Sequence, residues 1–321
     1  MIGLVANPRS GKDIRRLVAN AALSTLADKV SIVRRVLIGA AEAGERRFLV
    51  LPDAQRICRQ AVDGLRLDVE VDEVVCDVHD DESDTAAAAV AMKAAGCGAV
   101  VVLGGDGTNR AVATGWPDVP VIPISTGTNN VFPRQIEATV AGAAAGLVST
   151  GVVPLSAVAT PAKVVHLAVE GGLDDLALID AVLVSDRFVG TRALFDPAML
   201  RVAVLSRSEP ASVGMASIGG LVRPCGAGDD AAVVLRFGAG GRSVRAPLAP
   251  GLYVDVPVAS DAALGLGERV EVTGPGVLAL DGERTRVLGD GQRAVLRVER
   301  DGPMVIDADE ALARGRAAFL R

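Results

Sequence analysis

Aromatic residues are scarce in this chain of 321 residues, which has one Trp, one Tyr and six Phe. Proteins that bind single-stranded nucleic acids stack the bases on such side chains, so this class is disfavoured. An excess of basic charge is also missing, because 33 Lys and Arg are outnumbered by 39 Asp and Glu, for a net charge of −6. An acidic protein binds polyanions poorly, so we expect neither nucleic-acid binding nor stable membrane association.

Side chains that hold metals or act as nucleophiles with histidine are few and scattered. The four cysteines form no CxxC pair, so neither a zinc site nor a disulfide framework is expected. The two histidines, His79 and His166, stand in no recognisable motif, which disfavours a Ser-His-Asp triad. No apolar run reaches 18 residues, and the opening MIGLVANP resembles a strand rather than a secretory signal. We therefore expect a cytoplasmic protein.

The first half of the chain alternates short apolar runs with stretches of helical periodicity. The clearest runs are IGLVAN (2–7), RFLVLP (47–52), AVVVL (99–103) and VPVIPI (119–124). Continuous apolar runs of this length are typical of strands buried in a parallel sheet. Helical spacing is seen at 13–26, 30–43, 54–64 and 86–95. This order predicts an α/β domain with a doubly wound parallel sheet over residues 1–150.

The second half changes character. From about residue 160 to 300, Val-rich runs are separated by Gly, Pro and Asp turns, with one helical stretch near 211–222. This pattern predicts an all-β, sandwich-like domain over residues 151–300. Residues 301–321 are largely helical in pattern, and we expect them to pack back on the first domain.

Three polar loops that contain glycine follow apolar strands of the first domain: NPRSGK (7–12), GGDGTNR (104–110) and STGTNN (125–130). The second loop does not match a dinucleotide fingerprint, because Arg110 stands where the third glycine is required. The first loop does not match a P-loop, because Asp13 stands where a Ser or Thr is required. Parallel strands end at one edge of a sheet, so these loops are expected to share a crevice. Their backbone N–H groups, hydroxyls and lysine would suit phosphate groups.

Asp106 lies between the glycines of the second loop. A carboxylate beside phosphates is unfavourable unless it contacts Mg²⁺ or a hydroxyl proton. Phosphoryl transfer needs a group that orients or deprotonates the attacking hydroxyl, and Asp106 is suitably placed for that task. The alternative is an ordinary N-cap for a helix that begins near Thr108.

GGDGT (104–108), together with NPRSG (7–11) and TGTNN (126–130), resembles the superfamily of NAD kinases and diacylglycerol kinase-like lipid kinases. The resemblance covers nearly the whole chain. NPRSGKDIRRL and GGDGTNRAVA resemble in particular the ATP-NAD kinase-like acetoin-catabolism protein X group. The resemblance implies an α/β domain followed by a β-sandwich, ATP bound between them with Mg²⁺, and a homodimer or homotetramer.

The resemblance also implies roles for individual residues. Asp106 would orient or deprotonate the 2′-hydroxyl of NAD, and Asn109 and Asp180 would bind the acceptor. In ALIDAVLVSD (177–186), Asp180 matches the acid of an Asn–acid pair that binds the NAD adenosine, but Ile179 stands at the Asn position. On this resemblance, we expect the acceptor to be NAD or a related soluble metabolite. The implied contacts to ATP are Asn7, Ser10, Gly11, Lys12, Gly104, Gly105, Gly107, Thr108, Thr126, Gly127, Thr128 and Asn129.

LDGER (280–284) resembles the late DGE motif of the lipid-kinase branch, which makes Glu283 a second catalytic candidate with a Mg²⁺ or base role. The alternative is a hairpin turn, since Asp-Gly between strands is a turn signal. Two other functions stay open beside phosphorylation of a soluble hydroxyl. One is phosphorylation of a diacylglycerol or sphingoid lipid, and the other is nucleotide binding without catalysis.

Overall fold

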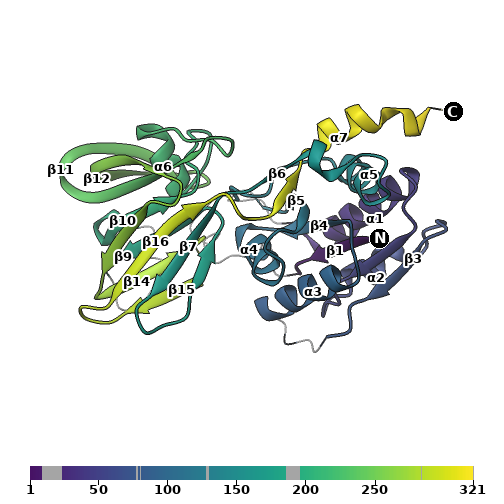
Figure 1. The fold of residues 1–321 in the computed structure, drawn as a ribbon, viewed down its shortest axis with the longest axis horizontal. Helices are drawn as coiled ribbons and strands as arrows, with labels where there is room; N and C mark the ends of the chain where they lie inside the picture. The colour runs from purple at the N-terminus through teal and green to yellow at the C-terminus, as the bar shows by residue number, and fades with distance from the viewer. Residues whose placement is uncertain are drawn as a thin grey trace. The chain divides into compact units, whose positions relative to one another are not determined.

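The computed structural model describes residues 1–8, 24–76, 79, 81–127, 130–185, 196–282 and 284–320. These residues form two compact units, drawn in Figure 1. Within the described residues, unit one comprises 1–8, 24–161 and 302–320, and unit two comprises 162–301 with the gaps just given. The chain therefore passes from unit one to unit two and back again.

Unit one is built on a seven-stranded sheet in the order β3-β2-β1-β4-β5-β17-β6. All neighbouring pairs are parallel except β17 and β6. The strands are β1 (Ile2–Ala6), β2 (Arg47–Val50), β3 (Glu70–Glu73), β4 (Ala99–Gly104), β5 (Pro120–Ser125), β6 (Ala159–Pro161) and β17 (Met304–Ile306). Every residue of β1 and β4 is buried, as expected for central strands covered on both faces.

Helices cover both faces of this sheet. One hydrophobic core lies under α1 (Leu26–Glu42), α2 (Ile57–Val62), α5 (Ala138–Ser149) and α7 (Ala308–Gly315). Another lies under α3 (Glu82–Ala94) and α4 (Asp106–Gly115). The predicted doubly wound α/β architecture is therefore confirmed. The helix predicted over 13–26 falls almost entirely outside the described residues.

Helices α1 and α5 approach each other through glycines. A Cβ atom built on Gly39 would lie 2.1 Å from the carbonyl oxygen of Thr139, and one built on Gly142 would lie 2.1 Å from the carbonyl oxygen of Val36. Real side chains do not tolerate such distances, so the two backbones meet where only glycine fits. Close approach here seals one face of the sheet beneath β1 and β4.

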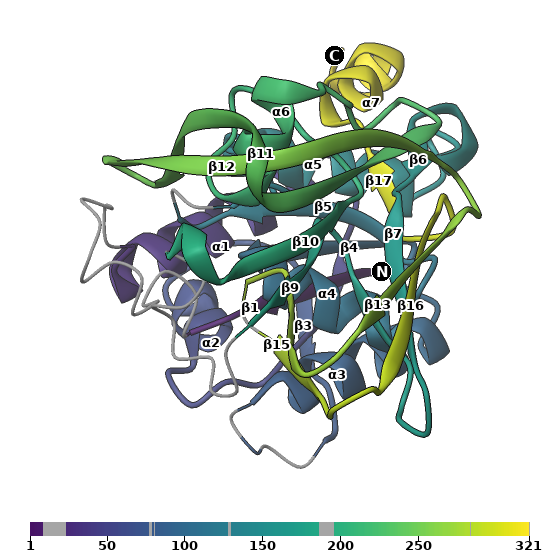
Figure 2. The same cartoon turned by 90° about the vertical axis from the view of Figure 1, so that its left-hand side faces the viewer.

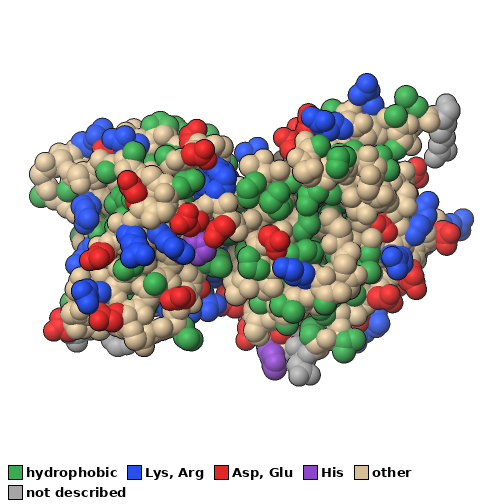
Figure 3. All heavy atoms as spheres, in the orientation of Figure 1, with side chains coloured by type: hydrophobic (Ala, Val, Ile, Leu, Met, Phe, Trp, Pro, Cys, Tyr) green, Lys and Arg blue, Asp and Glu red, His purple; other side chains and the backbone are tan. Residues whose placement is uncertain are grey.

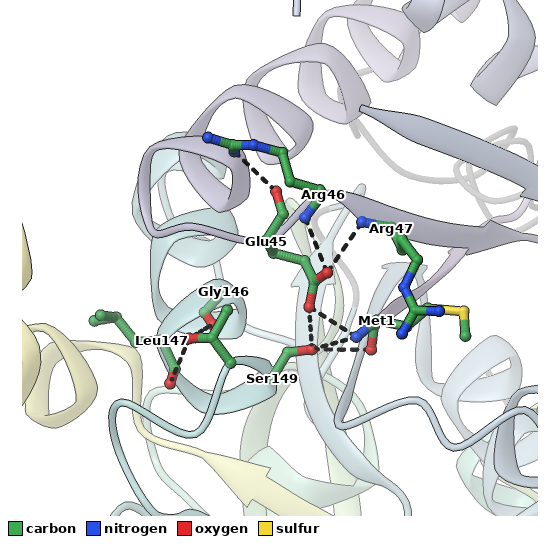
Figure 4. A network of polar contacts seen from close by, with 8 residues as sticks. Met1, Glu45, Arg46, Arg47, Gly146, Leu147 and Ser149 are labelled. Carbon is green, nitrogen blue, oxygen red and sulfur yellow. Dashed lines mark hydrogen bonds and ion pairs between the residues drawn. The ribbon is translucent and has the colours of Figure 1, made fainter. Parts of the chain in front are cut away.

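A polar network joins the start of the chain to the end of α5 (Figure 4). The Met1 amine donates to Glu45 Oε2 at 2.7 Å and to Ser149 Oγ at 3.0 Å. Burial raises the pKa of Glu45, but the Met1 amine, the Ser149 hydroxyl and the N–H groups of Arg46 and Arg47 outweigh it and lower this pKa to about 2. The network thus joins the start of β1 to the loop between α1 and β2 and to the end of α5.

Unit two contains two antiparallel sheets, with strand orders β12-β11-β10-β9-β14-β15 and β13-β16-β7-β8. Their facing side chains form one core, and α6 covers the other face of the larger sheet, which confirms the predicted sandwich-like domain. Figure 2 shows β11 and β12 as a long, curved ribbon.

The elements of unit two are as follows: β7 (Val164–Val169), β8 (Asp175–Ala177), β9 (Asp180–Val184), β10 (Leu200–Leu205), α6 (Met215–Val222), β11 (Ala231–Ala249), β12 (Leu252–Gly265), β13 (Arg269–Thr273), β14 (Gly276–Leu280), β15 (Arg284–Leu288) and β16 (Arg293–Glu299). Three short 3-10 helices complete the described chain: Leu155–Ala157, Pro197–Met199 and Arg316–Phe319.

The chain passes between the units twice, near residues 161–164 and near residues 299–304, and these two passages are flanked by antiparallel pairs. Pro161 pairs with Met304 on the unit-one side, and Val164 pairs with Glu299 on the unit-two side. Just beyond the first passage, the buried Lys163 donates to the carbonyl oxygens of Gly226 (2.9 Å) and Ala231 (2.6 Å). Burial lowers the pKa of this lysine.

The second passage is held by the same loop. Just before it, Arg300 donates to the carbonyl oxygens of Ala227 (3.0 Å) and Asp229 (2.8 Å) and forms an ion pair with Asp230. One loop of unit two, residues 225–231, therefore anchors both passages.

Acidic and basic side chains are intermixed on the face drawn in Figure 3. Exposed ion pairs of the described residues include Arg293 with Glu170 and Arg245 with Asp255. In the part of the chain that the structure describes, no helix is both long and apolar enough to cross a membrane.

Candidate functional site

The strands that precede the three glycine loops are neighbours in the sheet of unit one. β1 pairs with β4, and β4 pairs with β5, all in parallel. Asn7, Gly105 and Thr126 follow these strands directly, so they lie at the same sheet edge. Ligands of open α/β sheets bind at this edge, outside the carboxyl ends of the strands.

Asn7 joins the first loop to the second. Its backbone N–H donates to the carbonyl oxygen of Leu103 at 3.1 Å, and its Nδ2 donates to Thr108 Oγ1 at 2.8 Å. Thr108 packs so closely on Gly104 that a Cβ built on this glycine would lie 2.5 Å from Thr108 Oγ1. Asn7, Gly104 and Thr108 are thus one packed group, and the Thr108 hydroxyl is held as an acceptor for the amide.

The N-terminus of α4 meets the third loop. Its N-cap is Gly105, which has no side chain to cap the N–H groups of the first turn. A Cβ on Gly105 would lie 2.8 Å from Asn130 Oδ1, and Asn130 Nδ2 donates to Ser125 Oγ at 2.9 Å. The Ser125 hydroxyl in turn donates to the carbonyl oxygen of Gly127 at 2.7 Å. A glycine-lined helix N-terminus of this kind suits an anionic group.

Asp106 is the first residue of α4 and does not cap its own helix, so the N-cap interpretation is wrong. Its carboxylate instead accepts N–H bonds from Val131 (3.1 Å) and Phe132 (2.7 Å). The helix begins two residues earlier than Thr108 because Gly105 takes the extended N-cap conformation. The two backbone bonds fix the carboxylate in one orientation, while a carboxylate has lone pairs enough for further donors.

Asn109, one turn further into α4, is 2% exposed. Its Nδ2 donates to the carbonyl oxygen of Gly105 at 2.9 Å. Its Oδ1 is buried and has no hydrogen-bond partner among the described residues. Buried acceptors are normally paired, so this oxygen is a candidate for a donor on a bound molecule.

In unit two, Asp281 joins two predicted motifs, the ALIDAVLVSD stretch expected to bind the acceptor and the LDGER stretch that carries the second catalytic candidate. Its carboxylate accepts N–H bonds from Leu178 (3.0 Å), Ile179 (2.8 Å) and Asp180 (3.3 Å), and its own N–H donates to the carbonyl oxygen of Asp180 at 3.0 Å. Asp180 thereby begins β9 beside the hairpin that carries LDGER. The Ile179 side chain is 1% exposed and belongs to the core.

The LDGER segment forms the hairpin between β14 and β15, which pair from Leu280 and Arg284 onward. Asp281 (φ 49°) and Gly282 (φ 71°) both take the left-handed conformation that tight hairpins require. The turn interpretation is therefore correct, and the catalytic role of Glu283 stays a prediction. Six predicted site residues lie outside the described residues: Ser10, Gly11, Lys12, Thr128, Asn129 and Glu283.

The donor set can be compared with what Mg²⁺ requires. Among the residues that the structure describes, no group of three or more His, Cys, Asp or Glu side chains could hold a metal by itself. Mg²⁺ in kinases is usually bound through one or two carboxylates together with substrate phosphates and water. Asp106 beside the glycine loops fits this pattern, because it supplies one oriented carboxylate at the edge formed by the carboxyl ends of β1, β4 and β5.

Three residues that hold these segments in place were not predicted from the sequence. Lys29 and Asn130 bind the glycine loops, and Asp281 binds the start of β9. Lys29 shares its side of α1 with the buried residues Val33 and Val36, and a lysine at that helical spacing was the available signal. The sequence around Asp281 contains no signal that predicts its long-range hydrogen bonds.

Comparisons with known proteins define the class. The ATP-NAD kinase N-terminal domain matches residues 2–153. Yeast NADH kinase, in a crystal structure with NADH, superposes with a TM-score of 0.56 at 12% identity, over 99% of this chain and 86% of that one. A putative diacylglycerol kinase from Bacillus anthracis superposes with a TM-score of 0.51 at 12% identity, over 95% of this chain and 96% of that one. The chain has an NAD kinase-like fold.

Sequence similarity narrows the class to a family. The acetoin catabolism protein X C-terminal domain matches residues 163–301. The acetoin catabolism protein X of Cupriavidus necator H16 is 37% identical over 305 residues, which are 90% of this chain and 85% of that protein. The chain belongs to the acetoin catabolism protein X family.

Proposed function

We propose that this protein is a kinase that transfers the γ-phosphoryl group of ATP to a hydroxyl of NAD or of a related soluble metabolite. The observation that carries the proposal is the Asp106 carboxylate, held by two backbone N–H groups at the N-terminus of α4. It lies between glycine-containing loops at the edge of the sheet where ligands bind in this architecture. The kinase fold shared with yeast NADH kinase supports the same reaction class.

In the proposed reaction, the acceptor oxygen forms a bond to the γ-phosphorus while the bond from that phosphorus to the β,γ-bridging oxygen breaks, so ADP leaves. The acceptor proton passes to the Asp106 carboxylate, which later releases it to water. Bound Mg²⁺ would neutralise charge on the phosphate groups. The oriented Asp106 carboxylate lowers the barrier by holding the hydroxyl in line, and proton acceptance by such a group typically contributes about 10²–10⁴-fold.

The phosphate chain of ATP is proposed to bind to the first turn of α4 and to the loops that hold Asn7 and Thr126. Gly104 and Gly105 support this assignment, because side chains at either position would collide with Thr108 or Asn130 and would crowd the approach of a phosphate. The uncapped N–H groups of α4 provide donors for its oxygens.

For the acceptor, we propose Asn109 and Asp180 as contacts. The unpartnered Oδ1 of Asn109 suits a hydroxyl or amine donor, and Asp180 is held in place through Asp281. Because Ile179 lies in the core, an amide contact to the adenosine of NAD is missing at that position, which favours a metabolite related to NAD over NAD itself.

The decisive experiment incubates the purified protein with ATP, Mg²⁺ and NAD, and then with a panel of soluble diols and polyols. We expect ADP formation that depends on one acceptor, together with its phosphorylated product by mass spectrometry. Absence of transfer to every soluble acceptor would contradict the proposal. Diacylglycerol and sphingoid bases in mixed micelles test whether the reaction instead belongs to lipid phosphorylation.

A second candidate, nucleotide binding without catalysis, is favoured by one observation, the burial of Ile179 where a polar contact to the acceptor is expected. In that case ATP binds, no acceptor is phosphorylated, and Asp106→Asn leaves ATP affinity unchanged. Any transfer that Asp106→Asn abolishes would exclude it. We further propose a homodimer or homotetramer, which light scattering with size exclusion would measure directly.

A further inference from the structure

Lys29 is a lysine in the interior of unit one. It lies in the first turn of α1, and the residue is 1% exposed. Its neighbours on the same side of the helix, Val33, Val36 and Leu37, belong to the hydrophobic core. Burying an ammonium group among apolar side chains is costly unless the group is hydrogen-bonded, so its contacts indicate why it is there.

Those contacts lead to the first glycine loop. Lys29 Nζ donates to the carbonyl oxygen of Asn7 and to that of Pro8, each at 2.9 Å. These are charge-assisted bonds, which are stronger than bonds between neutral groups. They fix the backbone of the chain as it leaves β1, at the edge of the sheet where the proposed phosphate site begins.

The bonds also act on a second loop through Asn7. While its carbonyl oxygen is held by Lys29, its N–H binds the carbonyl oxygen of Leu103 and its side chain binds Thr108. Thr108 lies in the first turn of α4, against Gly104. A displacement of Asn7 would therefore disturb both the first glycine loop and the start of α4 in the second.

We infer that Lys29 is a positioning residue of the phosphate site, which holds the Asn7–Pro8 backbone, and through Asn7 the start of α4, in the geometry that binds the phosphate chain of a nucleoside triphosphate. The inference rests on the proposed function, because it takes the glycine loops as the phosphate site. It assigns the task to a lysine of α1, outside all three glycine motifs.

The test compares Lys29→Met with Lys163→Met. Lys163 is also a buried lysine whose ammonium binds two backbone carbonyl groups, but it belongs to unit two and contacts none of the three loops through any bond described above. Calorimetry measures the affinity of each variant for ATP with Mg²⁺ and for inorganic tripolyphosphate. Thermal unfolding and amide hydrogen exchange at Asn7 are recorded on the same samples.

We expect Lys29→Met to weaken both ATP and tripolyphosphate by about tenfold or more, as the loss of charge-assisted bonds implies, and to speed exchange at Asn7. Lys163→Met should lower thermal stability and leave both affinities within about twofold of the wild type, since its bonds lie outside the site. Lys29→Gln, which keeps an N–H donor and so supports the fold where methionine does not, should lie between Lys29→Met and the wild type.

Three outcomes would overturn the inference. Equal affinities for the wild type and for the folded Lys29 variants would remove the positioning role and leave the proposed kinase function standing. An equal loss of affinity in Lys163→Met would mark the effect as general destabilisation. A wild-type protein that binds neither ATP nor tripolyphosphate would overturn the proposed function together with the inference.

Discussion

The Oδ1 atom of Asp106 lies 2.7 Å from the backbone nitrogen of Phe132. This bond ties the first residue of α4 to the segment that follows β5, so the second and third glycine loops are held together by the carboxylate itself. Val131 adds a second N–H at 3.1 Å to the same oxygen. The aspartate therefore combines a structural task with the proposed chemical one, and the two can be separated by substitution.

Asp106→Asn is expected to separate them. The Oδ1 of asparagine can keep both N–H bonds, so we expect the free energy of unfolding to fall by less than about 1 kcal/mol and ATP affinity to persist. Phosphoryl transfer should fall by about 10²–10⁴-fold, because an amide cannot accept the acceptor proton. Steady-state kinetics and calorimetry on the same protein measure both effects.

Asp53→Asn is the control for this prediction. Asp53 also follows a strand of the unit-one sheet, and its carboxylate also accepts two N–H bonds, from Gln55 and Ile57 at 2.9 Å each. The Asp53→Asn variant should retain phosphoryl transfer activity. A similar loss of activity in both variants would show that the loss at Asp106 reflects loop structure rather than chemistry.

Asp281 is expected to decide the stability of unit two. Asp281→Ala leaves three N–H groups without their acceptor and replaces an aspartate, which tolerates the left-handed conformation at φ 49°, by an alanine, which tolerates it less well. We therefore expect the free energy of unfolding to fall by about 3 kcal/mol. Asp281→Asn keeps the bonds made by Oδ1 and tolerates the left-handed conformation, so its cost should be about 1 kcal/mol.

Urea titration monitored by circular dichroism gives both values. Asp290→Ala changes an exposed aspartate of another Asp-Gly turn and should be nearly neutral. If all three variants unfold together with the wild type, then the bonds of Asp281 do not stabilise unit two.

Glu45 is expected to make stability depend on acid pH. Its pKa in the folded protein, about 2, lies below the ordinary value of 4.5, so the contribution is complete above about pH 4.5 and is lost as the pH falls through 2. The shift corresponds to roughly 3 kcal/mol. Glu45→Gln should unfold more easily at neutral pH and should lose less stability than the wild type between pH 5 and pH 2. Parallel pH profiles for the two proteins would contradict this assignment.

Gly142→Ala should disturb the contact between α1 and α5. The added methyl group would lie 2.1 Å from the carbonyl oxygen of Val36, so the helices must separate, and overpacking of this kind costs about 1–3 kcal/mol. Gly228→Ala is the matched control, because a Cβ there meets nothing within 4 Å. Thermal unfolding compares the two variants. Equal melting temperatures would show that α1 and α5 accommodate the methyl group without a loss of stability.

Elements with continuous apolar sequence were the most predictable. The runs at 2–7, 99–103 and 119–124 correspond to β1, β4 and β5 within one residue at each end, because a strand buried on both faces needs apolar side chains at every position. Parallel pairing of these strands then places their loops at one edge. The position of the three glycine loops at one edge of the sheet could therefore be predicted from the sequence.

Other features depend on partners far away in the chain. The direction of the Asp106 carboxylate is set by backbone N–H groups 25 and 26 residues later, and that of Asp281 by groups about 100 residues earlier. The sequence around Lys29 indicates only a polar residue in a helix and does not predict which carbonyl groups it binds. Local periodicity carries no information about such bonds, because each depends on how separate elements pack.

The direct pairing of Pro161 with Met304 has a consequence for how this gene can be divided. The described part of unit two is inserted between two adjacent strands of unit one, so a cut at the middle of the chain yields no intact half. Cloning residues 1–161 alone would remove β17 and α7, and would expose the edge of β5 that pairs with β17 and the side of α5 that packs with α7. A short turn that joins residue 161 to residue 302 would instead restore the sheet order, and unit two could be exchanged as a cassette between relatives at those two points.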